Sequence, residues 1–303
     1  MRIALTYNLK RSAGEAYADL DSAATVRAIA TAIAAAGHRV TRIEVSRPIE
    51  RVVARLRALA PDLVFNIAEG VRGASREALW PAVFEELELP YTGSPPGVLA
   101  ACLDKALACR IVAAAGVRVA GEGWPAIVKP RFEGSSKGIS QASIVRDEAA
   151  LAAALANARY EMVVERFIDG ADVAVGWVAG LGLLSAIHYV YEASGPHRIL
   201  DRVVKERGAA VEILPLDPRL RVAAERAFAA LGVVGFGRAD FRVTPEGEPV
   251  FLEMNPLPSL DPADGELYAA SGLSAPELIA AIIDAVPRCA REVARGRTGH
   301  RRM

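Results

Sequence analysis

The 303-residue sequence predicts a protein of mixed α/β and α+β class, in which a parallel-sheet domain is followed by antiparallel sheets backed by helices. Apolar runs near the N-terminus alternate with helical patterns in the order 2–7, 22–36, 39–45, 49–59 and 62–67. Strands that alternate with helices form parallel sheets with right-handed crossovers. From residue 161 onward, short apolar runs follow one another across turns, which is typical of an antiparallel sheet.

The composition indicates a globular protein without a strong electrostatic preference. Apolar residues make up 52% of the chain, enough for one large domain or two to three small ones. Lysine plus arginine equals aspartate plus glutamate at 36 each, so we expect neither nucleic acid nor a membrane as a partner. Three irregularly spaced cysteines indicate neither a disulfide framework nor a zinc site. Without a signal sequence or a membrane-spanning window, the expected location is cytoplasmic.

The first helix can begin after Asp21 or Ser22, either of which is a suitable N-cap, and Gly37 ends it. In a parallel sheet, ligands meet the loops at the carboxyl ends of the strands. Here those loops follow the first and third strands and contain Glu15 and Glu69. These two acids are functional candidates, and the alternative is that each is a solvated loop acid.

A further helix is expected at 75–87, and the turn within 89–96, with a glycine and paired prolines, suits a domain boundary. Asp104 can cap a later helix, which places Lys105 in its first turn. A lysine there opposes the helix dipole at a cost of about 0.3–1 kcal/mol. A ligand phosphate as its partner would explain this cost, and exposure at the surface is the alternative.

An apolar strand at 126–128 leads into a loop of small residues that carries Lys129 and Lys137. Ser135 and Ser136, which lie between glycines, present backbone N–H groups with little side-chain bulk. Such a loop can close over phosphate oxygens. Its spacing matches neither G-x-x-x-x-G-K-[ST] nor G-x-G-x-x-G. A polar turn with solvated lysines is the alternative interpretation.

The strand EMVVERF follows this loop and a short helix. Near its end, Glu165, Phe167 and Ile168 are placed where an apolar slot with exposed backbone would hold a purine. Asp172 follows where a carboxylate would meet ribose hydroxyls. Considered without the rest of the chain, these residues are equally consistent with a purely structural role.

Lys205 lies in a polar stretch, 192–210, that we expect to be a long loop. Loops of this length often act as lids over a site. Asp217 and Pro218 then open an amphipathic helix.

The stretch 235–256, GFGRADFRVTPEGEPVFLEMNP, predicts a β-hairpin because polar and apolar residues alternate along both halves. With a four-residue loop, Thr244 pairs with Pro249. The same register sets Asp240 opposite Glu253, so two carboxylates would share one face of the hairpin.

Opposed carboxylates repel each other by about 4 kcal/mol at a separation of about 4 Å and an effective dielectric of about 20. Arg238, which the register sets opposite Asn255, is one compensating charge, as a structural salt bridge. A hard cation compensates better, because two carboxylates and the amide oxygen of Asn255 form a magnesium ligand set that leaves positions for phosphate oxygens.

Taken together, these blocks resemble the D-alanine–D-alanine ligase-like branch of the ATP-grasp superfamily. The resemblance extends from the first strand to about residue 285. It depends on LPYTGS with the later Asp104-Lys105 pair, IVKPRFEGSSKGI, VERFIDGADV and GRADFRVTPEGEPVFLEMNP. It implies an ATP-grasp fold with an N-terminal parallel domain (1–93), a central lobe with the glycine-rich loop (94–162), a C-terminal lobe with the metal site (163–287) and a basic tail (288–303).

The resemblance also implies roles for individual residues. The residues matched to nucleotide binding are Lys105, Lys129, Glu133, Ser135, Ser136, Glu165, Phe167, Ile168, Asp172 and Lys205. The matched ligands of Mg²⁺, or of Mn²⁺ in its place, are Asp240, Glu253 and Asn255. The residues matched to groups that act on the substrates and intermediate are Glu15, Ser135, Lys205 and Arg238.

The reaction that the resemblance implies is ATP-dependent joining of a carboxylate to an amine through an acyl phosphate. The amide product belongs to peptidoglycan synthesis or to specialised metabolism, and the resemblance suggests a homodimer through the N-terminal domain. The alternatives are a phosphotransferase acting on a small carboxylate or hydroxyl substrate, and a nucleotide-binding protein without turnover.

Several positions depart from the ligase pattern, and all of them concern the substrate. The first loop lacks the glycine pair of the peptidoglycan ligases. Asp264 falls near the serine with which those ligases hold the second amino acid's carboxylate, and an acid there would repel a free carboxylate. We therefore expect amino-acid-type substrates other than those that give D-alanyl-D-alanine.

Overall fold

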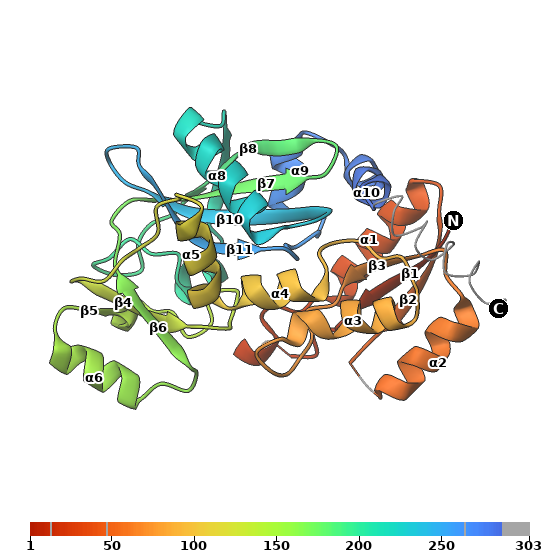
Figure 1. Cartoon of the computed structure of the whole chain (residues 1–303), viewed down its shortest axis with the longest axis horizontal. Helices are drawn as coiled ribbons and strands as arrows, with labels where there is room; N and C mark the ends of the chain where they lie inside the picture. The colour runs from red at the N-terminus through yellow and green to blue at the C-terminus, as the bar shows by residue number, and fades with distance from the viewer. Residues whose placement is uncertain (13, 47, 264, 287–303) are drawn as a thin grey trace, which may run out of the picture.

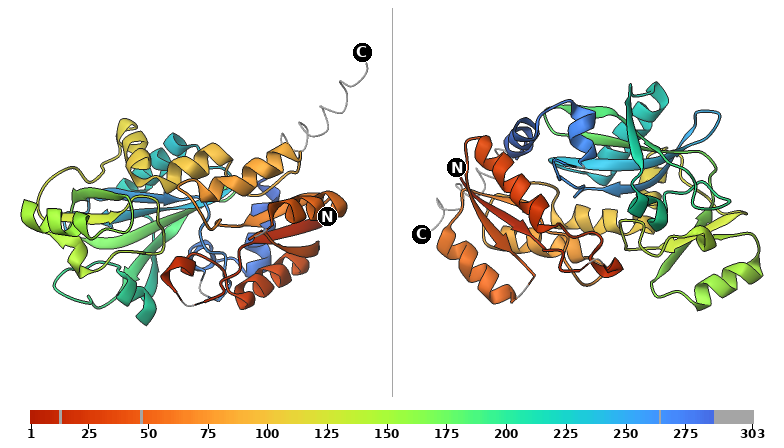
Figure 2. Two further views of the ribbon diagram at one scale, coloured as in Figure 1. Left: turned by 90° about the horizontal axis from the view of Figure 1, so that it is seen from below. Right: turned by 180° about the vertical axis from the view of Figure 1, so that it is seen from behind.

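The computed structural model describes residues 1–12, 14–46, 48–263 and 265–286. The predicted basic tail (288–303) and Asp264 therefore lie outside the described residues. The N-terminal sheet and a small central lobe lie at opposite ends of the molecule, and a larger sheet lies between them and to one side (Figures 1 and 2).

The N-terminal sheet is parallel, as predicted, with strand order β2-β1-β3. Its elements are β1 (Arg2–Tyr7), α1 (Ala23–Ala35), β2 (Arg39–Glu44), α2 (Ile49–Leu59) and β3 (Leu63–Ile67). Ser22 caps α1 by accepting a hydrogen bond from the backbone N–H of Thr25. The strand expected within 89–96 is reduced to a single parallel bridge between Val64 and Tyr91.

Four short helices lead from this sheet to the rest of the protein. They are η2 (Arg76–Ala78), α3 (Leu79–Glu86), α4 (Pro96–Leu103) and α5 (Lys105–Ala114). Asp104 ends α4 and caps α5, accepting from the backbone N–H of Leu107 at 3.1 Å. Figure 1 shows α4 bridging the N-terminal domain and the larger sheet.

The central lobe is an antiparallel sheet of order β5-β4-β6. Its elements are β4 (Ala126–Pro130), β5 (Ile144–Val145), α6 (Glu148–Ala156) and β6 (Met162–Arg166). Leu151 on α6 packs against Ala126, Val128 and Val145. This small core supports β4, and the glycine-rich loop begins where β4 ends.

The larger sheet is antiparallel, as predicted, with order β11-β10-β7-β8-β9. Its strands are β7 (Ala171–Val178), β8 (Gly182–Val190), β9 (Ala210–Leu214), β10 (Phe236–Val243) and β11 (Pro249–Asn255). Helices α5 and α8 (Pro218–Leu231) cover one face, where Phe228 packs with Ala239 and Phe251. In Figure 1, α8 lies in front of this sheet.

The long loop predicted over 192–210 is shorter than expected, because only 192–201 and 208–209 lie outside helices and strands. This segment contains the helix α7 (Arg202–Arg207) and reaches the start of β9. Asp201, which is almost fully buried, caps the helix by accepting from the backbone N–H of Val204 at 2.9 Å. A buried aspartate at an N-cap favours the helix over a coil.

The C-terminal helices α9 (Glu266–Ser271) and α10 (Ala275–Asp284) return the chain to the N-terminal domain. Ile279 and Ile283 of α10 share a core with Ile29 and Ile33 of α1. The last helix of the segment predicted as the C-terminal lobe therefore packs on the first domain, and the predicted domain boundaries otherwise remain predictions.

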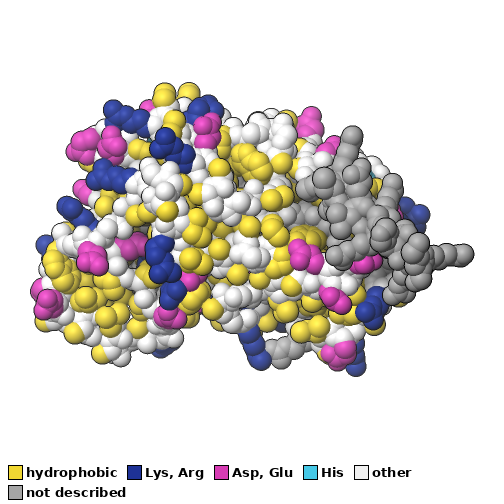
Figure 3. Space-filling view, viewed as in Figure 1, with side chains coloured by type: hydrophobic (Ala, Val, Ile, Leu, Met, Phe, Trp, Pro, Cys, Tyr) yellow, Lys and Arg dark blue, Asp and Glu magenta, His cyan; other side chains and the backbone are white. Residues whose placement is uncertain are grey.

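On the face in Figure 3, basic and acidic side chains lie close to one another, mainly at the left and the lower right, and the middle is mostly apolar or uncharged. This mixture agrees with the equal numbers of the two charge types in the sequence. Among the helices that the structure describes, none combines the length and the apolar character needed to cross a membrane.

Candidate active site

The hairpin of β10 and β11 brings together the four polar residues predicted to share one face. Asp240 pairs with Glu253 and Arg238 pairs with Asn255, as predicted. The predicted pairing of Thr244 with Pro249 was wrong, because Pro249 pairs with Val243. The register shifts by one residue between Asp240 and Phe241, where β11 has one extra residue. Such a β-bulge explains why the two acids pair as predicted although the residues at the turn do not.

Each carboxylate on this face has a cationic partner. Arg238 donates two hydrogen bonds to Asp240, at 2.7 and 2.9 Å, and a third to Glu266 at 2.9 Å. Lys105 lies 3.0 Å from Glu253. Arg238 therefore offsets the repulsion between Asp240 and Glu253, which is the structural salt bridge considered in the sequence analysis.

Lys105 and Lys129, two of the lysines predicted to bind phosphate, are buried beside this face, at 5% and 6% exposed. Lys105 lies in the first turn of α5 and also donates to the backbone carbonyl of Glu133. Lys129 lies on β4 and pairs with Glu165 at 2.8 Å. Burial rules out the alternative that these lysines are exposed at the surface. The charges of both lysines act on Glu253 of the hairpin.

The electrostatic environment differs between the two hairpin acids. Burial opposes ionisation of Glu253, but the positive charges of Lys105 and Lys129 outweigh burial and lower its pKa to about 2. For Asp240, burial outweighs the attraction of Arg238 and raises the pKa. Lys205 has a lowered pKa because of burial and the like charge of Arg238. An ionised glutamate is thus fixed among cations.

The glycine-rich loop follows β4 and is anchored on both sides. Ser135 and Ser136 have left-handed backbones, with φ of 51° and 55°. The Ser136 hydroxyl donates to the backbone carbonyl of Leu200 at 2.7 Å. Lys137 is buried and forms ion pairs with Asp19 of the N-terminal domain and with Glu133. The loop therefore contacts both the N-terminal domain and the segment before α7.

An apolar slot adjoins Lys105 and Lys129, the lysines predicted to bind phosphate. The predicted purine-binding residues Glu165, Phe167 and Ile168 all line it. Other apolar lining residues are Ile127, Ile139, Phe241 and Leu252. A slot with aromatic and aliphatic walls and a few polar groups at one end suits a flat heteroaromatic ring.

Asp172 also lines this slot, but its carboxylate is already engaged. Arg242 donates to both of its oxygens at 2.8 Å, and the hydroxyl of Tyr191 donates to it as well. The predicted role of Asp172 in binding ribose would compete with this buried ion pair, and it remains a prediction.

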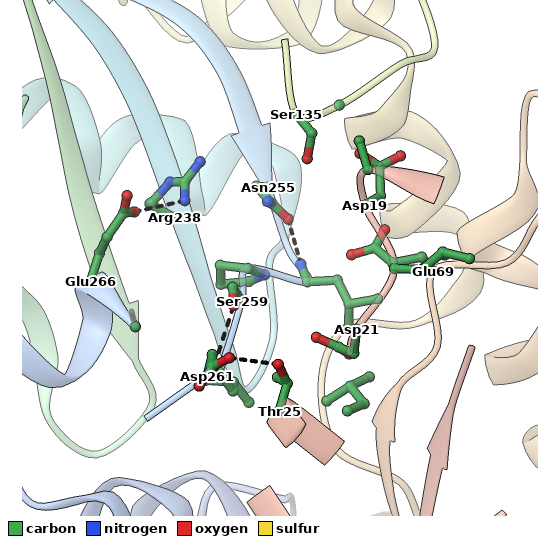
Figure 4. Close-up of a pocket in the computed structure, with 18 of the residues that line it drawn as sticks. Asp19, Asp21, Thr25, Glu69, Ser135, Arg238, Asn255, Ser259, Asp261 and Glu266 are labelled. Atoms are coloured by element: carbon green, nitrogen blue, oxygen red, sulfur yellow. Dashed lines mark hydrogen bonds and ion pairs between the residues drawn. The ribbon is translucent and has the colours of Figure 1, made fainter. Parts of the chain in front are cut away.

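A larger pocket of about 1000 Å³ lies between the hairpin and the N-terminal domain (Figure 4). It shares several lining residues with the apolar slot, so the two cavities adjoin. The charged residues that line both are Lys105, Lys205, Arg238, Glu253 and Glu266. Ser135 of the glycine-rich loop and Asn255 of β11 line the larger pocket. A nucleotide in the slot would thus direct its phosphates toward this pocket.

Glu15 does not line either cavity. Its carboxylate accepts a hydrogen bond from the backbone N–H of Gly138 at 2.7 Å and lies 3.7 Å from Arg202. Glu15 begins a short 3-10 helix, Glu15–Tyr17. The structure therefore favours an anchoring role for Glu15 over contact with substrate.

The sequence analysis missed several residues that do line the larger pocket. Among the acids these are Asp19, Asp21, Glu77, Asp261 and Glu266. Asp21 was noted only as a possible helix cap. The available signal was its position in the loop after β1, at the carboxyl edge of a parallel sheet. Glu69, which was named as a functional candidate, also lines this pocket.

The donor set on the hairpin fits a magnesium ion chemically. Asp240 and Glu253 are carboxylates at paired positions, and Asn255 adds an amide oxygen on the same face. The raised pKa of Asp240 means that further positive charge beside it is favourable. Within the described ranges, no three His, Cys, Asp or Glu side chains cluster as a metal site, so two acids and an amide are the available set.

Comparison with known proteins gives a consistent result. A family model described as the D-ala D-ala ligase C-terminus matches residues 113–284. The D-alanine–D-alanine ligase of Anaeromyxobacter sp. is 34% identical over 290 residues, covering 86% of this chain and 90% of the relative. That of Citrifermentans bemidjiense is also 34% identical, covering 86% and 89%. The resemblance inferred from the sequence is confirmed.

Solved structures agree on the fold. The D-alanine–D-alanine ligase from Bacillus anthracis complexed with ATP superposes with a TM-score of 0.76 at 20% identity, covering 97% of this chain and 99% of that one. VanG D-Ala:D-Ser ligase from Enterococcus faecalis gives 0.71 at 20% identity, covering 94% and 99%. At these identities the likeness shows the fold alone, and the predicted ATP-grasp fold is confirmed.

Proposed function

The chain belongs to the D-alanine–D-alanine ligase family of ATP-grasp enzymes, and from this premise we propose how its site joins a carboxylate to an amine with ATP. The observation that carries the proposal is the position of Glu253, which lies beside Lys105 and opposite Asp240 where the two cavities adjoin. The apolar slot would hold the adenine, and the larger pocket would hold amino-acid-type substrates.

The phosphates would lie between Lys105, Lys129 and the glycine-rich loop. The lysines supply fixed positive charge at the point where the γ-phosphate transfers to the substrate carboxylate. Ser135 and Ser136 present backbone N–H groups above it. Lys205, on α7, lines both cavities beside these groups.

Asp240, Glu253 and Asn255 would hold Mg²⁺, with Mn²⁺ as a substitute. When bound, the ion would neutralise phosphate charge during transfer. In the structure, Arg238 donates hydrogen bonds to both carboxylate oxygens of Asp240. For Asp240 to bind the ion, Arg238 would have to release at least one of these oxygens. Arg238 also lines the larger pocket, where its guanidinium can stabilise the oxyanion of the tetrahedral state that forms when an amine attacks the acyl phosphate.

The glycine-rich loop would exclude water from the acyl phosphate. Its contacts with Asp19 and Leu200 close it against two different parts of the protein. Exclusion of water prevents hydrolysis of the reactive intermediate before the amine reaches it. A homodimer through the N-terminal domain and a cytoplasmic location remain predictions.

The proposal is tested by measuring ADP release over a panel of amino acids and dipeptides, singly and in pairs, with mass spectrometry of the product. We expect ADP release that needs both a carboxylate and an amine, and a product joined by an amide. A stable phosphorylated product without an amine would indicate a phosphotransferase instead. ATP binding without ADP from any pair would indicate a nucleotide-binding protein without turnover.

A further inference from the structure

Two segments that are far apart in the sequence both line the apolar slot. The glycine-rich loop contributes Ser136 and Ile139, and the segment before α7 contributes Ile199 and Leu200. The two segments touch directly, because the Ser136 hydroxyl donates to the backbone carbonyl of Leu200. The slot is therefore enclosed in part by a contact between two segments, and how long that contact lasts depends on what else joins them.

Gln141 provides a second and larger connection between these segments. It follows the glycine-rich loop as the first residue of the 3-10 helix η3 (Gln141–Ser143). Its side-chain amide donates to the backbone carbonyl of His197 at 2.9 Å and accepts from the backbone N–H of His197 at 3.0 Å. It also donates to the Ser194 hydroxyl at 3.0 Å. One side chain thus uses both its donor and its acceptor groups to hold the segment before α7.

The connection continues to α7 through Asp201. Asp201 is almost fully buried, and one of its carboxylate oxygens caps α7 by accepting from the backbone N–H of Val204 at 2.9 Å. The other oxygen accepts from the Ser194 hydroxyl and lies 3.5 Å from the amide nitrogen of Gln141. The carboxylate that starts the helix carrying Lys205 therefore belongs to the same hydrogen-bond network as Gln141.

This network packs closely but lies outside the two cavities. A Cβ atom at Gly195 would lie 2.7 Å from Cγ of Gln141, so a side chain there would displace the glutamine. Neither Gln141 nor Ser194 nor Asp201 lines either cavity. The network therefore offers no contact to a nucleotide or a substrate. What it determines is the position of the two segments that do line the slot.

We propose that Gln141 is a positioning residue that holds the glycine-rich loop against the segment before α7 while the acyl phosphate exists. This inference rests on the proposed ligase function. Water that reaches the acyl phosphate adds to its carbonyl carbon and displaces phosphate, which regenerates the carboxylate and releases a proton after ADP has already formed. Hydrogen bonds between the two segments disfavour the separated state, in which water would enter.

The first test measures how much amide is formed for each ADP released, with a substrate pair that the ADP-release panel identifies as active. Gln141→Ala removes the whole amide, and Gln141→Glu keeps its size but removes both N–H donors. In each variant, ADP release with the carboxylate but without the amine should rise about tenfold, and amide per ADP should fall at least about twofold. This ratio does not depend on how much of the protein is folded, so a loss of stability alone would leave it unchanged.

The second test needs neither turnover nor nucleotide. Hydrogen–deuterium exchange of the full chain, read by mass spectrometry, reports on the backbone N–H groups of Val204 and Lys205, which both bond to Asp201. Gln141→Ala should speed the exchange of 202–207 by about tenfold. The reason is that the substitution removes hydrogen bonds from the network that holds the start of α7, although Gln141 is 60 residues away from Asp201 in the sequence.

Asn157→Ala is the matched control for both tests. Asn157 is exposed, lies outside both cavities, and donates its side-chain amide to the backbone carbonyl of Ala153 in α6 of the same lobe. Its substitution should change neither the amide per ADP nor the exchange of 202–207. Circular dichroism establishes that each variant is folded.

The outcomes separate this inference from the ligase proposal. Unchanged exchange of 202–207 in Gln141→Ala would overturn the inference. Unchanged amide per ADP in that variant would also overturn it and would leave the ligase function standing. Faster exchange in Gln141→Ala, without ADP release from any substrate pair, would support the connection between the two segments and overturn the ligase proposal.

Discussion

The two walls of the larger pocket differ in how far cations balance their acids, since Asp19 on the N-terminal side has cationic partners but Asp21 has none among the described residues. On the hairpin side, each acid has a cation close by: Glu253 has Lys105 at 3.0 Å, and Asp240 has Arg238 at 2.7 Å. On the N-terminal side, no described cation pairs with Asp21. Both walls are partly buried, so the difference lies in the partners and not in exposure.

This contrast separates a carboxylate whose charge the protein balances from one whose charge it does not balance. A buried carboxylate beside lysines stays ionised and keeps a defined position, as the lowered pKa of Glu253 indicates. A carboxylate without a partner is held closer to neutrality, as with Asp21, and gains most from an incoming cation. Three experiments sharpen or break this comparison.

The largest effect is expected for Glu253→Gln. The substitution keeps the size of the side chain but removes the charge that Lys105 faces and one proposed magnesium ligand. ADP release, measured in a coupled assay with an active substrate pair, should fall at least about 100-fold. Glu246→Gln, at the exposed turn of the same hairpin, is the matched control and should keep full activity. Near-normal turnover of Glu253→Gln would remove the metal assignment.

A smaller effect is expected from breaking the buried pair between Lys129 and Glu165. Lys129→Met leaves a buried carboxylate without its partner, so the free energy of unfolding should fall by about 3–5 kcal/mol in urea titrations. The double variant Lys129→Met with Glu165→Leu should recover most of this stability. It should still bind ATP more weakly in calorimetry, because the lysine proposed to bind phosphate is absent. ATP affinity equal to that of the unaltered protein would contradict the assignment of Lys129.

The smallest effect is expected for Asp21→Asn without ligand. The pKa of Asp21 is about 7 in the folded protein and about 4 in an unfolded chain. Ionisation therefore costs the folded state more, so the unaltered protein loses stability as the pH rises from about 4 to about 7. The variant should avoid this loss and be more stable at pH 8, by at most about 4 kcal/mol and by less where water reaches the carboxylate.

Thermal unfolding at a series of pH values checks this expectation. The stability difference between Asp21→Asn and the unaltered protein should be largest above about pH 7 and should vanish below about pH 4. A variant that is less stable than the unaltered protein at pH 8 would mean that Asp21 already has a cationic partner. The contrast between the two walls would then fail.

Local patterns in the sequence were enough to predict the hairpin face. Side chains alternate along a strand with a period of two, so the spacing of Arg238, Asp240, Glu253 and Asn255 determined that they share a face. The loop length was predicted wrongly by one residue, yet the acids still pair because a bulge restores the register. The segment 192–210 shows the limit of such patterns, because the helix in it depends on the buried cap Asp201.

The sequence by itself determined which residues line the slot and the hairpin face proposed to bind the nucleotide, because each block is a continuous segment whose chemistry depends on local spacing. Only the tertiary structure decided which acid of the first loop reaches the pocket. Glu15 turns to Gly138, whereas Asp19 meets Lys137, which is 118 residues away in the sequence. Residues so far apart in the sequence are brought together by the packing of domains. The short-range pattern of side chains does not indicate such contacts.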